Sequence, residues 1–190
     1  MDNQQDLKEE IARVARKIYE RTGITGRDVE NWLEAERIVL ERLSVRDNLQ
    51  KALQDTNKAI ESDPESSFAY VARGIIYSGL RRYQEAIVDY NKAIELDERS
   101  VHAYSDRGSV YGILGNYKKC IEDTSKAIEL DPKYNYPYYS RGWAYKFLGD
   151  ETSAIRDWKI SAKLGYKKAQ EILKERGIEL LDCLLCMEQK

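Results

Sequence analysis

The fold is decided by an octapeptide that occurs three times: YVARGIIY at residues 70–77, YSDRGSVY at 104–111 and YYSRGWAY at 138–145. Each copy begins and ends with tyrosine, and its central Arg-Gly recurs every 34 residues. Each copy is followed by a turn and a second stretch with helical spacing of its apolar residues. A fixed period of this size indicates a tandem array in which one supersecondary unit is repeated.

The period and its residues resemble the tetratricopeptide repeat. The resemblance is carried by the small residue at repeat position 8, Tyr at 11, Ala at 20 and 27, and Pro at 32. The predicted repeats span 67–100, 101–134 and 135–168, and one period earlier a degenerate repeat spans 33–66. The degenerate copy has Leu40 and Leu43 where the other copies have Gly and Tyr.

Packing considerations favour the same fold. Gly at position 8 lowers helix propensity by about 1 kcal/mol, which is tolerated where two helices approach closely. One helix pair cannot bury its apolar face alone, so neighbouring pairs stack into a superhelix with a concave face. We therefore predict an all-α protein, an α–α superhelix (a tetratricopeptide-repeat solenoid) with extra helices at both ends.

Both ends of the array depart from the repeat pattern. Residues 1–46 are predicted to be a helical segment that merges into the degenerate repeat, with an amphipathic helix over 6–21. The glycines that end this helix and the stretch from Trp32 to Glu36 resemble a short bacterial domain of unknown function. Residues 169–190 are predicted to be C-terminal capping helices, since terminal repeats are commonly atypical.

The composition argues against several classes of function. The net charge of −2 gives no electrostatic basis for binding nucleic acid or an anionic membrane. No apolar run approaches the roughly 20 residues needed to cross a bilayer. The polar start of the sequence and its three cysteines predict a cytoplasmic protein and no disulfide scaffold.

Few residues suggest catalysis. Cys183 and Cys186 form a C-x-x-C, but there is one histidine in the chain, His102, so a zinc site would lack ligands. Cys183 falls on an apolar helical face, which favours packing over a redox role. His102 has no Ser, Cys or Asp constellation beside it and is predicted to be a surface or groove contact. We therefore predict no enzymatic activity, no cofactor and no metal.

Two charged positions recur together in the repeats. Arg occupies position 7 and Asp occupies position 23 of the partner helix, and we predict an ion pair across each helix pair. The predicted pairs are Arg73 with Asp89, Arg107 with Asp123, and Arg141 with Asp157. The degenerate repeat keeps Asp55 but has Val39 in place of Arg.

The resemblance implies that positions 2, 5, 9 and 12 of each first helix face the concave side. The ligand-binding residues predicted in this way are Val71, Ile75, His102, Ser105, Ser109, Tyr136, Tyr139 and Trp143. Aromatic residues in a concave site are the usual anchors of binding energy, so Tyr139 and Trp143 are expected to carry it. Packing of Trp143 against the C-terminal helices is an equal alternative.

These positions predict a scaffold that binds a peptide, a helix or a protein partner. Some relatives bind chaperone C-terminal carboxylates through groove Lys, Arg and Asn, but positions 5 and 9 here lack that pattern, so this ligand class is rejected. The alternative function is self-assembly. A helix from Ile178 to about Glu188 has an apolar arc over half its circumference, so it is expected to pack against two neighbours, to fold back into the groove or to meet another chain. Tight capping or a homodimer is preferred to insertion into the groove.

Overall fold

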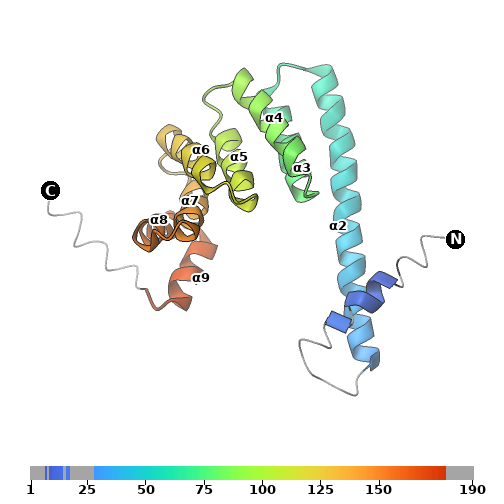
Figure 1. Ribbon diagram of the computed structural model, residues 1–190. Helices are drawn as coiled ribbons and strands as arrows, with labels where there is room; N and C mark the ends of the chain where they lie inside the picture. The colour runs from blue at the N-terminus through green and yellow to red at the C-terminus, as the bar shows by residue number, and fades with distance from the viewer. Residues whose placement is uncertain (1–6, 8, 15, 18–27, 179–190) are drawn as a thin grey trace. The chain divides into compact units, whose positions relative to one another are not determined.

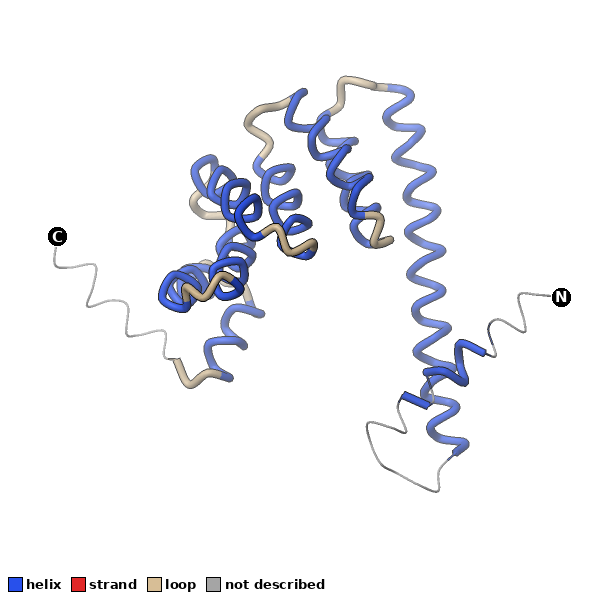
Figure 2. Tube along the Cα trace, viewed as in Figure 1, coloured by secondary structure: helices blue, strands red, loops and turns tan. Residues whose placement is uncertain are grey.

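The computed structural model describes residues 7, 9–14, 16, 17 and 28–178. The chain divides into two compact units, Met1–Gln54 and Asp55–Lys190. The described residues are helices joined by short turns, and none of them lies in a strand (Figure 2). The all-α expectation is therefore confirmed. Among these described helices none is both long and apolar enough to span a bilayer.

The first unit holds a short helix packed on the beginning of a long one. Ile11 and Val14 are buried against Val39, which is fully buried in α2 (Asp28–Ser62). Leu7 and Leu43 extend this cluster at its edges. The apolar face that the sequence predicts for the N-terminal helix is thus used in packing, at the described residues 9–14.

The degenerate repeat does not form a helix pair. Residues 33–62, where the sequence predicts two helices and a turn, lie in the single helix α2. In the other repeats the turn contains a residue with positive φ at position 15: Arg81 at 61°, Gly115 at 78° and Gly149 at 84°. Asp47 holds that position in α2, and there is no Gly or Pro between residues 28 and 62. Without a helix-ending residue the helix continues.

The second unit is a series of antiparallel helix pairs. In order they are α3 (Ser67–Gly79) with α4 (Tyr83–Leu96), α5 (Val101–Ile113) with α6 (Tyr117–Leu130), and α7 (Asn135–Phe147) with α8 (Glu151–Lys163). Figure 1 shows the two helices of each pair side by side. Side-chain caps at Ser66, Asn116 and Asp150 accept hydrogen bonds from backbone N–H groups and fix where three of these helices begin.

A small residue on the first helix of each pair meets a large or branched one on the second. A Cβ added to Gly74 would lie 2.6 Å from the Tyr90 ring, and one added to Gly142 would lie 2.5 Å from the Trp158 indole. Both aromatic side chains are almost completely buried. The recurring glycine is therefore required by close helix contact, as the sequence indicates.

The last helix closes the apolar core of the third pair. α9 (Lys167–Glu175) inserts Ala169 and Leu173, both fully buried, against Trp158 of α8. Ile178 packs on the same cluster where the described chain ends. α9 lies in the segment where the sequence predicts capping helices, and the predicted helix beyond Ile178 lies outside the described residues.

Candidate binding groove

Each Arg–Asp pair forms a two-pronged contact across its helix pair. Arg73 Nε and Nη2 lie 2.8 and 2.7 Å from the two carboxylate oxygens of Asp89. The pairs formed by Arg107 with Asp123 and by Arg141 with Asp157 repeat this geometry at 2.7–3.0 Å. The three carboxylates are 0–11% exposed, so each pair is buried and stabilised by hydrogen bonds at both prongs.

The same arginines also bind the preceding repeat. Their Nη1 atoms donate to residues 16 positions earlier, at 2.6–3.0 Å, and these acceptors are Asn57, Asn91 and Ser125. Each guanidinium therefore joins the two helices of its own repeat to the helix that precedes them, which is α2, α4 or α6. Sequence reasoning missed this link, although a polar residue recurs at repeat position 25 in all three cases.

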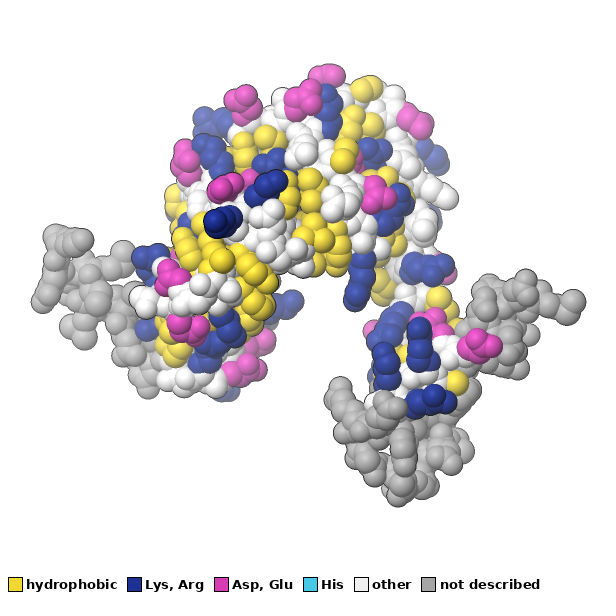
Figure 3. All heavy atoms as spheres, in the orientation of Figure 1, with side chains coloured by type: hydrophobic (Ala, Val, Ile, Leu, Met, Phe, Trp, Pro, Cys, Tyr) yellow, Lys and Arg dark blue, Asp and Glu magenta, His cyan; other side chains and the backbone are white. Residues whose placement is uncertain are grey.

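A hollow on the first helices of the last two pairs contains the predicted aromatic residues. Tyr136, Tyr139 and Trp143 of α7 line it together with Ser109 of α5, and its volume is about 240 Å³. Ile113 and Phe147 border it with 62% and 61% of their surfaces exposed. We call it the aromatic hollow. Hydrophobic side chains gather over the repeat helices in Figure 3, in keeping with a surface suited to apolar contacts.

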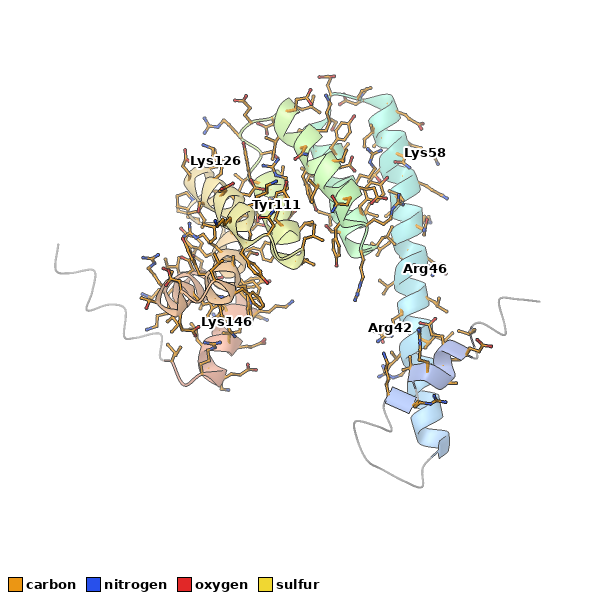
Figure 4. The ribbon with its side chains drawn as sticks, in the orientation of Figure 1. Arg42, Arg46, Lys58, Tyr111, Lys126 and Lys146 are labelled. Atoms are coloured by element: carbon orange, nitrogen blue, oxygen red, sulfur yellow. The ribbon has the colours of Figure 1, made fainter. Side chains whose placement is uncertain are left out.

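Trp143 packs on a buried ring and also lines the aromatic hollow. Its ring is half-buried and lies edge-on to Trp158 of α8, with ring centroids 5.2 Å apart. Its other neighbours are Tyr139 and Phe147, at 6.4 and 6.0 Å, and the Lys146 ammonium, 4.7 Å from the ring centroid (labelled in Figure 4). The indole thus packs on the core with one edge and lines the hollow with the rest.

A second hollow lies between the first two pairs and contains three of the other four predicted residues, all except Ser105. Val71, Ile75 and His102 line it, with Phe68 and Tyr134, and its volume is about 580 Å³. We call it the His102 hollow, because the His102 ring lies at its wall, 5.2 Å from the Tyr134 ring. The structure thus divides the predicted site between two neighbouring hollows.

Two predicted ligand-binding residues lie beneath the surface. Val71 is 5% exposed and Ser105 is completely buried, so neither presents its side chain as the sequence assumed. Position 5 faces the adjacent first helix as well as the concave side, and a small side chain there is covered. Ser109 is partly exposed, and its hydroxyl is 2.8 Å from that of Ser140 on α7.

Asp106 is a half-buried carboxylate that the sequence analysis did not single out. Burial raises its pKa to about 6, and the nearby His102 lowers it only partly. Burial and the Asp106 charge also raise the pKa of Tyr134 to about 12. Within residues 28–178 no side chain pairs with Asp106 or donates it a hydrogen bond, in contrast with Asp89, Asp123 and Asp157.

Little in the described residues resembles a catalytic centre. They contain no group of three or more His, Cys, Asp or Glu side chains placed to hold a metal ion. Cys120 is buried, and burial raises the pKa of its thiol to about 12, so the nucleophilic thiolate is disfavoured. Cys183 and Cys186 lie outside the described residues.

The stacked helix pairs define a tetratricopeptide-repeat solenoid. Residues 67–100 and 101–134 match the tetratricopeptide repeat family, and residues 6–41 match a family described as a protein of unknown function (DUF2934). Both resemblances predicted from the sequence are thereby confirmed. No curated protein matches the sequence significantly.

Solved structures of other repeat proteins share the fold. The crystal structure of MamA is 26% identical, with a TM-score of 0.56 over 88% of this chain and 94% of MamA. The Arabidopsis OM64 TPR domain is 23% identical, with a TM-score of 0.56 over 59% of this chain and 93% of that domain. The first TPR of Spaghetti (RPAP3), bound to the HSP90 peptide SRMEEVD, is 24% identical, with a TM-score of 0.55 over 60% and 91%.

Proposed function

We propose that this protein is a non-enzymatic scaffold whose repeat groove binds a segment of a protein partner, with the aromatic hollow as the main anchor point. The observation that carries the proposal is the set of half-buried rings of Tyr136, Tyr139 and Trp143 opening onto one hollow. Aromatic side chains held rigidly in a concave, partly desolvated site are typical of binding hot spots.

The lining of the aromatic hollow suits an apolar side chain. Its walls are aromatic rings and the aliphatic Ile113, and the Ser109 and Ser140 hydroxyls are hydrogen-bonded to each other. Those hydroxyls therefore require no ligand for their own satisfaction, but they can accept a backbone N–H from a bound segment. A Leu, Met or Phe side chain in an extended or helical segment meets these demands.

The Spaghetti structure supports only the general capacity of this fold to hold a peptide. Its peptide is acidic, and positions 5 and 9 of the three repeats over 67–168 carry no cationic residue that would suit such a ligand. Val71, Ser105 and Tyr139 stand at position 5, and Ile75, Ser109 and Trp143 at position 9. We therefore expect a partner of different chemistry.

The proposal is tested by selecting ligands directly. A displayed library of random 12-residue peptides is panned against the immobilised full-length chain, and the selected peptides are measured by calorimetry. Phe147→Ala is the sharper variant, because this ring is largely exposed and its removal leaves the core intact. We expect at least a tenfold loss of affinity, about 1.4 kcal/mol, for Phe147→Ala and for Trp143→Ala.

Val88→Ala is the matched control, because Val88 is 64% exposed on α4 and does not line the hollow. It should leave affinity unchanged. Circular dichroism melts of all three variants separate a lost contact from a lost fold, which matters most for Trp143 since it also packs on Trp158. Selected peptides that bind both groove variants as tightly as the parent chain would refute the proposal.

A further inference from the structure

The apolar surface of the aromatic hollow continues onto the ends of the two first helices that form it. Ile113 and Phe147 hold repeat position 13 and line the hollow, and the residues that follow them, Leu114 and Leu148, are also exposed. In the first pair this position is Gly79, so the exposed apolar surface belongs to the last two pairs. A surface of this kind marks a site of interaction, and it suits an occupant with several apolar side chains.

A lysine without a counter-charge stands beside the aromatic hollow. The Lys146 ammonium lies 4.7 Å from the centroid of the Trp143 ring, and the side chain is half-buried (Figure 4). Lys92 and Lys126 each pair with a glutamate three residues later, but no carboxylate among the described residues forms an ion pair with Lys146. The described residues that line the hollow include no charged side chain. Charge complementarity therefore favours an occupant that brings an acidic group close to Trp143.

The segment that follows Ile178 has this combination of side chains. Residues 179–190, ELLDCLLCMEQK, contain two pairs of leucines and a methionine, which are the kinds of side chain that the lining of the hollow suits. The acidic residues Glu179, Asp182 and Glu188 lie between and beside them, against a single cation, Lys190. The chain thus carries, outside the described residues, a segment whose apolar character and negative charge match the hollow and Lys146.

The last described residues are held by the final two helices. Arg176 forms an ion pair with Glu151, and its guanidinium lies 5.0 Å from the centroid of the Trp158 ring, so both partners belong to α8. The Ile178 N–H donates to the Leu173 carbonyl of α9 at 2.9 Å. The aromatic hollow lies between α5 and α7 and so extends to the preceding helix pair. A segment of the same chain is tethered at this end of the array, whereas a second copy can present its whole segment to the hollow.

We propose that the aromatic hollow binds residues 179–190 of a second copy of this chain, with the leucines on the apolar surface and an acidic side chain at Lys146. This inference rests on the proposed function and names the partner segment. Each copy has both a hollow and a segment, so the exchange is reciprocal. It gives a two-fold symmetric dimer with two identical junctions.

The first test measures the mass of the full-length chain by light scattering over a range of protein concentrations. We expect a dimer whose dissociation constant rises at least tenfold in Phe147→Ala, on the hollow, and in Leu184→Asp, on the segment. Lys146→Gln should weaken the dimer about two- to fivefold, as is usual for a partly exposed ion pair. Lys126→Gln is the matched control, because Lys126 pairs with Glu129 on α6 and does not line the hollow. It should leave the dimer unchanged.

The second test mixes the two weakened chains. Phe147→Ala keeps an intact segment and Leu184→Asp keeps an intact hollow, so a mixed dimer regains one intact junction that neither variant has alone. We expect the mixture to contain dimer at concentrations where each variant by itself is monomeric. Packing of one segment on another would give no such rescue. Circular dichroism melts of both variants separate a lost junction from a lost fold.

Three outcomes would overturn the inference: a chain that is monomeric at every concentration, a dimer that Phe147→Ala leaves intact, or a mixture without rescue. If the chain is monomeric and Leu184→Asp binds the selected library peptides more tightly than the parent, the occupant is the segment of the same chain. None of these results decides the proposed function, which the library peptides test separately. Peptides that are indifferent to both Phe147 and Trp143 would refute the proposed function itself.

Discussion

The buried ion pairs make a large contribution at the scale of single residues. Asp157 is completely buried, and its two oxygens accept from Arg141. Asp157→Asn leaves the guanidinium buried without its counter-charge. We expect the free energy of unfolding to fall by about 3–5 kcal/mol, measured by urea denaturation. Glu129→Gln, which breaks the exposed pair with Lys126, should cost under about 1 kcal/mol.

If the two substitutions had equal effects, the Arg141 pair would not be a buried interaction in solution.

The repeated pairs could be predicted from sequence because Arg and Asp recur together at fixed spacing. The link from Arg73 to Asn57 could have been found in the same way, since it uses the same 16-residue separation in the opposite direction.

Asp106 should give stability an unusual dependence on pH. Its pKa is about 6 in the folded chain and about 4 when unfolded, so the folded state binds the proton more readily. Its charge therefore destabilises the fold above pH 6, and this cost disappears as the pH falls to about 4. We expect Asp106→Asn to raise the free energy of unfolding at pH 7.5 by on the order of 1–2 kcal/mol.

The gain should shrink toward zero near pH 4. His102, Tyr90 and Tyr134 interact electrostatically with Asp106, and His102 is the one that lowers the pKa of its carboxyl group. The measurement is therefore made as thermal melts from pH 4 to 8 in a His102→Gln background. A pH-independent difference between the two chains would contradict the role assigned to the carboxylate.

At the scale of helices, close approach depends on a single missing side chain. In Gly142→Ala the new Cβ would meet Trp158, which is completely buried and whose Nε1–H donates to the Tyr139 carbonyl at 3.3 Å. The indole cannot shift without losing that bond. We expect the free energy of unfolding to fall by about 1–3 kcal/mol despite the better helix propensity of Ala.

Gly112→Ala is the matched control within α5, because its nearest contact is the Cys120 sulfur at 3.3 Å. Its effect should lie within about 1 kcal/mol of zero, since gained propensity offsets slight crowding. Chemical denaturation of both variants provides the comparison. Equal losses would mean that the helices are not held at the distance described here.

The element that the sequence did not predict is the continuous α2. The 34-residue register suggested a helix pair in residues 33–66, because the second half of that copy keeps its repeat residues. The register does not show whether a turn divides the two halves of a copy. Gly115 and Gly149 lie in such a turn at repeat position 15, whereas Asp47 at the same position lies inside the continuous helix α2. Turn chemistry at this position does not separate the copies alone, because Arg81 has a positive φ there without being glycine. The additional signal is the loss of the repeat Gly and Tyr at Leu40 and Leu43.

For the whole molecule, the boundary between the compact units lies inside one helix. The units divide between Gln54 and Asp55, within α2. The groove was predictable as a set of helix positions, yet the burial of Ser105 and the isolation of Asp106 were not. Both depend on which side chain lies opposite each position on the first helix of the neighbouring repeat. Repeat numbering alone does not identify that side chain.

The sequence beyond the described residues supports a test of self-assembly. Residues 179–190 contain Leu180, Leu181, Leu184 and Leu185. So many apolar residues are expected to be covered by the end of the stack or by a second copy. We expect deletion of 179–190, which leaves Ile178 in its cluster, to lower either the mass in light scattering or the melting temperature. An unchanged mass and melting temperature would exclude both arrangements.

The repeat arginines bind partners at equal sequence distances on both sides, and this restricts the insertions that the array can accept. Each guanidinium binds 16 residues forward in its own repeat and 16 residues back in the preceding one. Tandem duplication of any 34-residue unit from 67–168 therefore supplies an acceptor on both sides of the new junction. An insertion of another length inside one of these helices would move an arginine or aspartate away from its partner. Charge compensation thus favours gene rearrangements that add or remove whole repeats.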